Sequence, residues 1–117
     1  MTAPAVSSRD LPHPGREEIR LEAVLHALSD QMRLRIVRQL AADGDELSCS
    51  HIDLPVTKST TTHHFRVLRE AGVIRQVYRG TAKMNGLRED DLDDLFPGLL
   101  DAVLDAADRE SRRLGAG

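Results

Sequence analysis

The chain has few of the features that stabilise secreted or membrane proteins. It contains one cysteine, Cys49, so a disulfide framework within the chain is excluded. No apolar run approaches the roughly 20 residues of a membrane-spanning helix. The first fifteen residues hold Pro4, Pro12 and Pro14 without the apolar stretch of a signal peptide. We therefore expect a cytoplasmic protein in a reducing compartment, with no membrane partner.

Aromatic side chains are also scarce, since Phe65, Tyr78 and Phe96 are the three in the chain. The core must therefore be aliphatic, and a platform of rings for stacking single-stranded bases is not expected. Hydrophobic residues make up 40% and charged residues 30% of the chain, which is typical of a soluble globular protein. The 117 residues fit one domain with a modest core.

The net charge of −3 conceals two segments of opposite sign. Residues 58–88 carry seven Lys or Arg against one acid, a net charge of +6. Residues 89–110 carry nine acids against one base, a net charge of −8. The first segment is suited to phosphates, and we interpret the acids of the second as the solvated face of a dimerisation helix.

Apolar periodicity and capping residues predict four helices in the first part of the chain. They are Glu17–Leu28, a second helix capped by Ser29-Asp30 and stopped at Gly44, a short third helix from Ser48 to Leu54 before Pro55, and Lys58–Ala71, capped by Thr57 and stopped at Gly72. On the second helix Leu34, Val37, Leu40 and Ala41 form the predicted apolar stripe, with Arg33, Arg35 and Arg38 mostly off it.

A β-hairpin and two further helices are predicted to follow. Residues 73–78 and 81–85 flank an Arg79-Gly80 turn. A short helix then covers Glu89–Phe96, and Pro97 begins a last helix that ends at about Arg109. This order, α-α-α-α-β-β-α, predicts a mainly α winged helix-turn-helix with a small hairpin wing. We expect a mobile arm at residues 1–15 and the domain, with terminal dimerisation helices, at residues 16–113.

The polar face of the Lys58–Ala71 helix is the candidate interface with double-stranded DNA. Short hydroxyl side chains at a helix N-terminus allow close approach to a groove, and they bond to phosphates or to base edges. The candidate contacts are Lys58, Ser59, Thr60, Thr62, His63 and Arg66 on the helix, and Arg75, Arg79 and Lys83 on the hairpin. The alternatives are a solvated helix face and a charged sheet edge. For His64 we favour a buried hydrogen bond over a phosphate contact.

Two segments resemble the ArsR/SmtB-type regulators. Residues 27–40 resemble the second helix of that family, and residues 57–74 resemble its recognition helix. The family's Ser-x-His-Leu-x-x-Leu pattern is replaced by residues 62–68, with Thr62 for the Ser and Phe65 for the Leu. The resemblance covers roughly residues 19 to 105.

The resemblance implies a homodimeric repressor that releases its operator when an inducer binds. The first and last helices would pack across the two-fold axis. The expected interface residues are Leu21, Val24, Leu25, Leu28, Leu99, Leu100, Val103, Leu104 and Ala107. An unknown small-molecule inducer is a possible further partner, with a place between the helices of the dimer interface.

No metal site, cofactor or catalytic activity is expected. The family's Cys-x-Cys site is reduced to Cys49 and His51, which supply two of the usual four ligands. The last helix carries Asp101, Asp105 and Asp108 but no histidine. Cys49 is read as a small apolar filler, with a redox role as the alternative. Because His63 and His64 with Cys49 lack an orienting third group, we do not expect an enzyme.

A winged-helix module for protein–protein assembly is the alternative function, in which the basic face meets an acidic partner. Aromatic and aliphatic anchors would be expected at a protein interface. The outward hydroxyl groups of the Lys58–Ala71 helix instead favour DNA.

Overall fold

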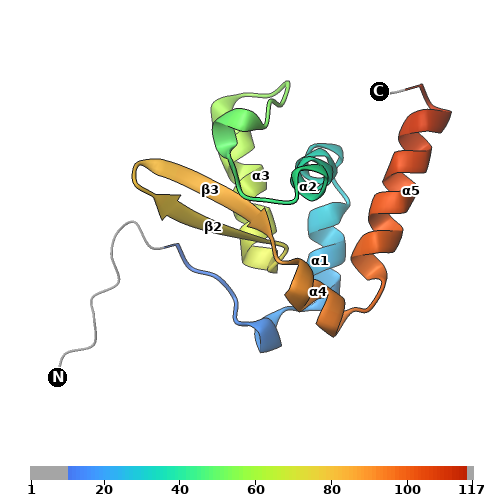
Figure 1. The fold of residues 1–117 in the computed structure, drawn as a ribbon, viewed down its shortest axis with the longest axis horizontal. Helices are drawn as coiled ribbons and strands as arrows, with labels where there is room; N and C mark the ends of the chain where they lie inside the picture. Colours follow the sequence, from blue (N-terminus) through green and yellow to red (C-terminus); the bar gives the residue numbers. More distant parts are fainter. Residues whose placement is uncertain (1–10, 116–117) are drawn as a thin grey trace.

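The structure, a computed structural model, describes residues 11–115 as five α-helices and a small sheet (Figure 1). A 3₁₀ turn, η1 (Arg16–Glu18), leads into the helices. The elements that follow are α1 (Leu21–Leu28), α2 (Gln31–Asp43), β1 (Leu47–Ser48), the 3₁₀ turn η2 (Cys49–His51), α3 (Lys58–Ala71), β2 (Ile74–Arg79), β3 (Ala82–Leu87), α4 (Glu89–Leu95) and α5 (Leu99–Arg113). The predicted winged helix-turn-helix fold is confirmed.

The sheet is antiparallel, with the strand order β1-β3-β2. The hairpin predicted from the sequence is present, and Gln76 pairs with Asn85 across it. Leu47 of β1 also pairs with Asn85, on the other side of β3. The two-residue strand β1 was not predicted, and it leaves β2 as an edge strand.

The core is mostly aliphatic, as the shortage of aromatic residues requires, and Phe65 adds a buried ring. α1, α2 and α3 contribute Val24, Ile36, Leu40, Phe65 and Leu68, all of which are buried. The hairpin adds Ile74, and α4 adds Leu92. α5 stands at the opposite side of the molecule from the hairpin (Figure 1).

The predicted helix signals at Asp30, Gly44, Thr57 and Gly72 are confirmed. The Asp30 carboxylate accepts from the backbone N–H groups of Met32 (2.8 Å) and Arg33 (3.1 Å), and Thr57 Oγ1 accepts from the N–H of Thr60 (3.2 Å). Gly44 and Gly72 end their helices at φ values of 74° and 86°.

The hydrogen bonds that cap α2 also affect the pKa of the Asp30 carboxyl. Partial burial raises the pKa of its carboxyl, but the N–H of Arg33, the charge of His64 and the N–H of Met32 together outweigh it. The pKa of Asp30 therefore lies below its ordinary value, so its stabilising effect is present above that value and is lost as the pH falls below it.

Three predicted helix boundaries are wrong, and in the first two cases a contact distant in sequence overrides the local pattern. The first helix begins at Leu21 and not at Glu17, since Ile19 is extended and inserts into the core. The third helix shrinks to η2 because residues 47–48 pair with β3. The last helix begins at Leu99, after Gly98 with φ 80°, and it continues to Arg113.

The expected N-terminal arm is described in part. Residues 1–10 lie outside the described range. Residues 11–15, which we expected to be mobile, are hydrogen-bonded to the domain through His13 and the carbonyls of Pro12 and Pro14. Within the described range, residues 11–15 are therefore bonded to the domain that we expected to begin at residue 16.

Substitution of Gly72 tests the packing between α3 and the chain before α1. A Cβ at Gly72 would lie 2.6 Å from Cγ1 of Ile19, whereas a Cβ at Gly44 would meet nothing within 4 Å. Both positions have positive φ, so Gly44→Ala should cost about 1–2 kcal/mol through the backbone alone. Gly72→Ala should cost about 1–3 kcal/mol more because it overpacks the core.

Urea unfolding of the two variants measures this difference. Equal losses in the free energy of unfolding would show that Ile19 does not pack against Gly72.

Candidate nucleic-acid interface

One side of α3 is polar and open to solvent, while the other side faces the core. Phe65 and Leu68 are 2% and 0% exposed. All six side chains that the sequence predicts as helix contacts are exposed: Lys58, Ser59, Thr60, Thr62, His63 and Arg66. The structure therefore brings this part of the predicted set together on one helix.

The hydroxyl groups of the first turns are held by local hydrogen bonds. Thr57 Oγ1 donates to Oγ1 of Thr60 (2.9 Å), and Oγ1 of Thr62 donates to the carbonyl of Lys58 (3.0 Å). A threonine that donates to the helix backbone still has lone pairs that accept from outside. In this rotamer Thr62 therefore presents an acceptor, which suits the amino groups on base edges.

The N-terminal half of α3 is fixed to α1 and α2 through a buried arginine. Arg33 donates from Nε to the carbonyl of Ala27 (2.8 Å) and from a terminal nitrogen to that of His26 (3.3 Å), at the C-terminal end of α1. The other terminal nitrogen lies 3.3 Å from Nδ1 of His64 on α3. Oδ2 of Asp30 is 3.9 Å from Nδ1 of His64.

These contacts settle two sequence predictions. His64 is buried and serves the structure, as we favoured. The placement of Arg33 off the apolar face was wrong, because it satisfies the last carbonyls of α1. A spacing of three and four residues from Ile36 and Val37, which are buried, is the signal that could have found it.

The hairpin presents its cations on two faces and not on one. Residues paired directly across a hairpin point to the same side, and successive residues alternate. Lys83 pairs with Tyr78, with its Nζ 5.9 Å from the ring centroid, on the face shared by Gln76 and Asn85. Arg75 and Arg79 therefore lie on the opposite face.

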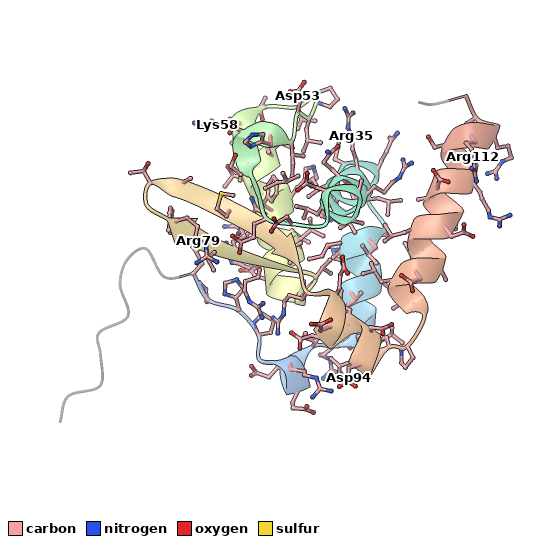
Figure 2. All side chains as sticks on the ribbon, viewed as in Figure 1. Arg35, Asp53, Lys58, Arg79, Asp94 and Arg112 are labelled. Atoms are coloured by element: carbon pink, nitrogen blue, oxygen red, sulfur yellow. The ribbon has the colours of Figure 1, made fainter. Side chains whose placement is uncertain are left out.

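Both arginines on that face lie near acids. Arg79 forms two hydrogen bonds with the carboxylate of Glu46 (3.2 and 3.0 Å), and this bond raises the pKa of Arg79. Arg75 is 3.9 Å from Asp91. Figure 2 shows Arg79 on the hairpin and Lys58 at α3, both on the side of the molecule away from Arg112 on α5.

Two cations of the basic segment are structural, which the charge count did not anticipate. Arg69 is buried and donates to Oε1 of Gln76 (2.6 Å). Arg88 is buried and donates to the carboxylate of Asp91 (2.9 Å). The exposed basic surface is therefore smaller than the net charge of +6 suggested.

The residues expected at a dimer interface fall into two groups. Val24, Leu28 and Ala107 are buried within the protomer, so they are not available to a partner. Leu21 and Leu25, one helical turn apart on α1, are 44% and 45% exposed. Leu99, Leu100, Val103 and Leu104 of α5 are half-buried.

Comparisons with known proteins agree with this architecture. Residues 28–77 match a family described as a helix-turn-helix domain. The chain is 37% identical over 89 residues to the uncharacterized HTH-type transcriptional regulator YceK of Bacillus subtilis, covering 74% of this chain and 88% of that one.

Solved structures show the same fold. An ArsR-like transcriptional regulator from Rhodococcus sp. RHA1 superposes with a TM-score of 0.56 at 26% identity, covering 82% of this chain and 87% of that one. The transcriptional repressor BigR from Xylella fastidiosa gives a TM-score of 0.52 at 22% identity, covering 65% and 85%.

The fold and the polar recognition helix define a DNA-binding winged helix-turn-helix protein. The chain belongs to the ArsR family of helix-turn-helix transcriptional regulators. Within residues 11–115, no helix has the length and hydropathy to cross a bilayer.

The ion pair between Glu46 and Arg79 predicts that removing the acid strengthens DNA binding. Glu46→Gln leaves Arg79 without a carboxylate partner, so this guanidinium becomes available to a phosphate. The slope of log affinity against log salt should steepen by about 0.9 for one added phosphate contact.

Binding to a DNA duplex at several salt concentrations measures the slope. Asp45→Asn, which changes the charge of the adjacent exposed residue, is the matched control. The prediction is wrong if both variants change the slope equally.

Proposed function

We propose that the protein is a homodimeric repressor that binds a pseudo-palindromic operator in double-stranded DNA and acts without a resident metal. The observation that carries this proposal is the division of α3, whose polar face is exposed while Phe65 and Leu68 fix its other face in the core. A rigid helix with an exposed hydroxyl and basic face is suited to a major groove.

The dimer is supported by apolar surface that one protomer leaves uncovered. Leu21 and Leu25 are both nearly half exposed on one side of α1. The apolar side of α5 is only half-buried. Packing α1 and α5 against a second copy would cover this surface, and a two-fold axis would set two copies of α3 about one helical turn of DNA apart.

Repression follows from occupancy, because a dimer spanning two successive major grooves blocks other proteins from the same DNA.

Metal sensing is disfavoured by the placement of the side chains that could bind a metal. Among the described residues no group of three His, Cys, Asp or Glu side chains converges. Cys49 Sγ accepts from Nδ2 of Asn85, and His51 Nδ1 is 2.6 Å from Oγ of Ser48.

An inducer remains a prediction, and a groove between α2 and α5 is where we would seek it. The groove has a volume of about 680 Å³. Leu34, Leu104 and Ala107 supply apolar walls. The charged lining is mixed, with Arg35 and Arg38 from α2 and Asp108 and Glu110 from α5. A ligand there would change the packing of α5 and, with it, the proposed dimer.

The dimer is tested by making α1 polar. Leu25→Ser removes one of the two exposed leucines of α1, so the dimer should dissociate into monomers at concentrations where the wild type remains dimeric. Val56→Ser, at a 37% exposed position before α3, is the control and should leave the dimer intact. Analytical ultracentrifugation measures both, and a wild type that sediments as a monomer would contradict the proposal.

DNA recognition is tested on fragments from around the protein's own coding region, by mobility shift at two salt concentrations. Lys58→Ala should weaken all sequences about equally and reduce the salt slope by about 0.9. His63→Ala should instead lose about 1–3 kcal/mol of discrimination at one base pair.

Arg35→Ala is the matched control, since Arg35 is an exposed cation on α2 (Figure 2). Equal effects of all three substitutions on matched and scrambled sites would overturn the assignment of α3 as the recognition helix. Binding that never exceeds the non-specific level would favour a protein partner.

A further inference from the structure

Residues 11–15, which we call the strap, lie along the open edge of the sheet. Because β2 is an edge strand, some of its backbone groups face away from β3. The N–H of Gln76 on this edge donates to Nε2 of His13 (2.9 Å), although the two residues are 63 positions apart. Figure 1 shows the strap, in blue, beside β2 on its way to η1.

Two buried arginines hold the strap on either side of His13. Arg69 donates from Nε to the carbonyl of Pro12 (3.2 Å), and Arg88 donates to the carbonyl of Pro14 (2.8 Å). Proline has no backbone N–H, so both prolines offer only acceptors, which guanidinium groups match. The strap is therefore bonded to α3, to β2 and to the residue that precedes α4.

The hydrogen bonds of His13 define its protonation state. Nδ1 lies 2.8 Å from the carbonyl oxygen of Leu11, and a carbonyl only accepts, so Nδ1 carries a proton. Nε2 accepts from the N–H of Gln76 and must therefore be unprotonated. A proton added to Nε2 would set two N–H groups against each other, and the bond to β2 would be lost.

The charges around His13 also oppose its protonation. Arg69 of α3, Arg75 of β2 and Arg88 act on the ring, while the nearby acid Asp91 of α4 is bonded to Arg88 (2.9 Å). Burial lowers the pKa of His13; the hydrogen bond to Leu11 opposes this effect, and the three arginines lower the pKa further. Its pKa in the docked strap lies below the ordinary value.

We propose that docking of the strap depends on pH. The strap stays bound across the junction of α3 and the hairpin while His13 is neutral, and it is released when His13 is protonated. The released strap binds the proton more readily than the docked strap. Docking is therefore at full strength above the ordinary histidine pKa of about 6.5 and weakens as the pH falls below it.

Release would act on the junction between recognition helix and wing. Arg69, which holds the strap at Pro12, also donates to Gln76, and Nε2 of Gln76 donates to Oδ1 of Asn85 (2.7 Å). Loss of the strap removes one partner of Arg69 and exposes the edge of β2. A consequence for DNA affinity rests on the proposed function, whereas the strap itself does not.

Nuclear magnetic resonance on the full chain tests the strap directly. At about pH 7.5, above the ordinary histidine pKa, His13 should be the neutral Nδ1–H tautomer and the Gln76 amide should be protected from hydrogen exchange. At about pH 5.5, one unit below that pKa, the Gln76 protection should fall by up to about tenfold beyond the intrinsic change in exchange rate.

Three variants sharpen the test. His13→Gln keeps an acceptor near the position of Nε2 without titrating, so Gln76 should stay protected at both pH values. His13→Ala should leave Gln76 unprotected at both. His51→Asn, which changes an exposed histidine bonded to Ser48, should keep the wild-type pH dependence.

The proposal is overturned if His13 titrates at or above the ordinary value, or if the Gln76 amide is insensitive to pH in the wild type. Operator affinity of the wild type and His13→Gln at the two pH values tests the consequence separately. A constant ratio between them would break the link to DNA while leaving the strap. No operator binding at the higher pH would reject the proposed function alone.

Discussion

Burial of Phe65 and Leu68 from α3 is the interaction on which the rest of the structure depends. Burying each side chain contributes about 1.5–3 kcal/mol. α3 begins with a run of Ser and Thr residues, which are weak helix formers, so its stability must come from packing and not from propensity. Once these two residues enter the core, the orientation of the hydroxyl-rich face is fixed, because the two faces belong to one rigid helix.

Two buried arginines then hold α3, one near its middle and one at its last turn. Arg33 joins His64 to the carbonyls that end α1, and Arg69 joins the last turn of α3 to Gln76 of the hairpin. A buried guanidinium stabilises a fold only when its donors are satisfied, and here backbone carbonyls and polar side chains supply the acceptors. The recognition helix is therefore held by hydrogen bonds of defined direction as well as by an aliphatic core.

Local signals in the sequence predicted most of the fold. Asp30, Gly44, Thr57 and Gly72 act through backbone groups only a few residues away, so their roles could be read directly. β1 could not, since Leu47 is 38 residues from its contact Asn85. The apolar spacing likewise gave no sign that Ile19 would leave the helix to enter the core.

The candidate site follows the same rule. The exposed face of α3 follows from helical periodicity, and its predicted residues are all exposed. The pairing of Arg79 with Glu46 spans 33 residues, and the docking of Pro12 on Arg69 spans 57. Neither leaves a trace in local composition, so a proline-containing segment looked mobile and a paired arginine looked free.

Because aromatic residues are so few, the intrinsic fluorescence of the protein reports on the hairpin. Tyr78 is the single tyrosine, and the chain has no tryptophan. Its ring lies on the hairpin with the ammonium group of Lys83 nearby. The intrinsic fluorescence of the protein therefore originates from one strand of the wing, and a spectroscopist can follow that strand without attaching a dye.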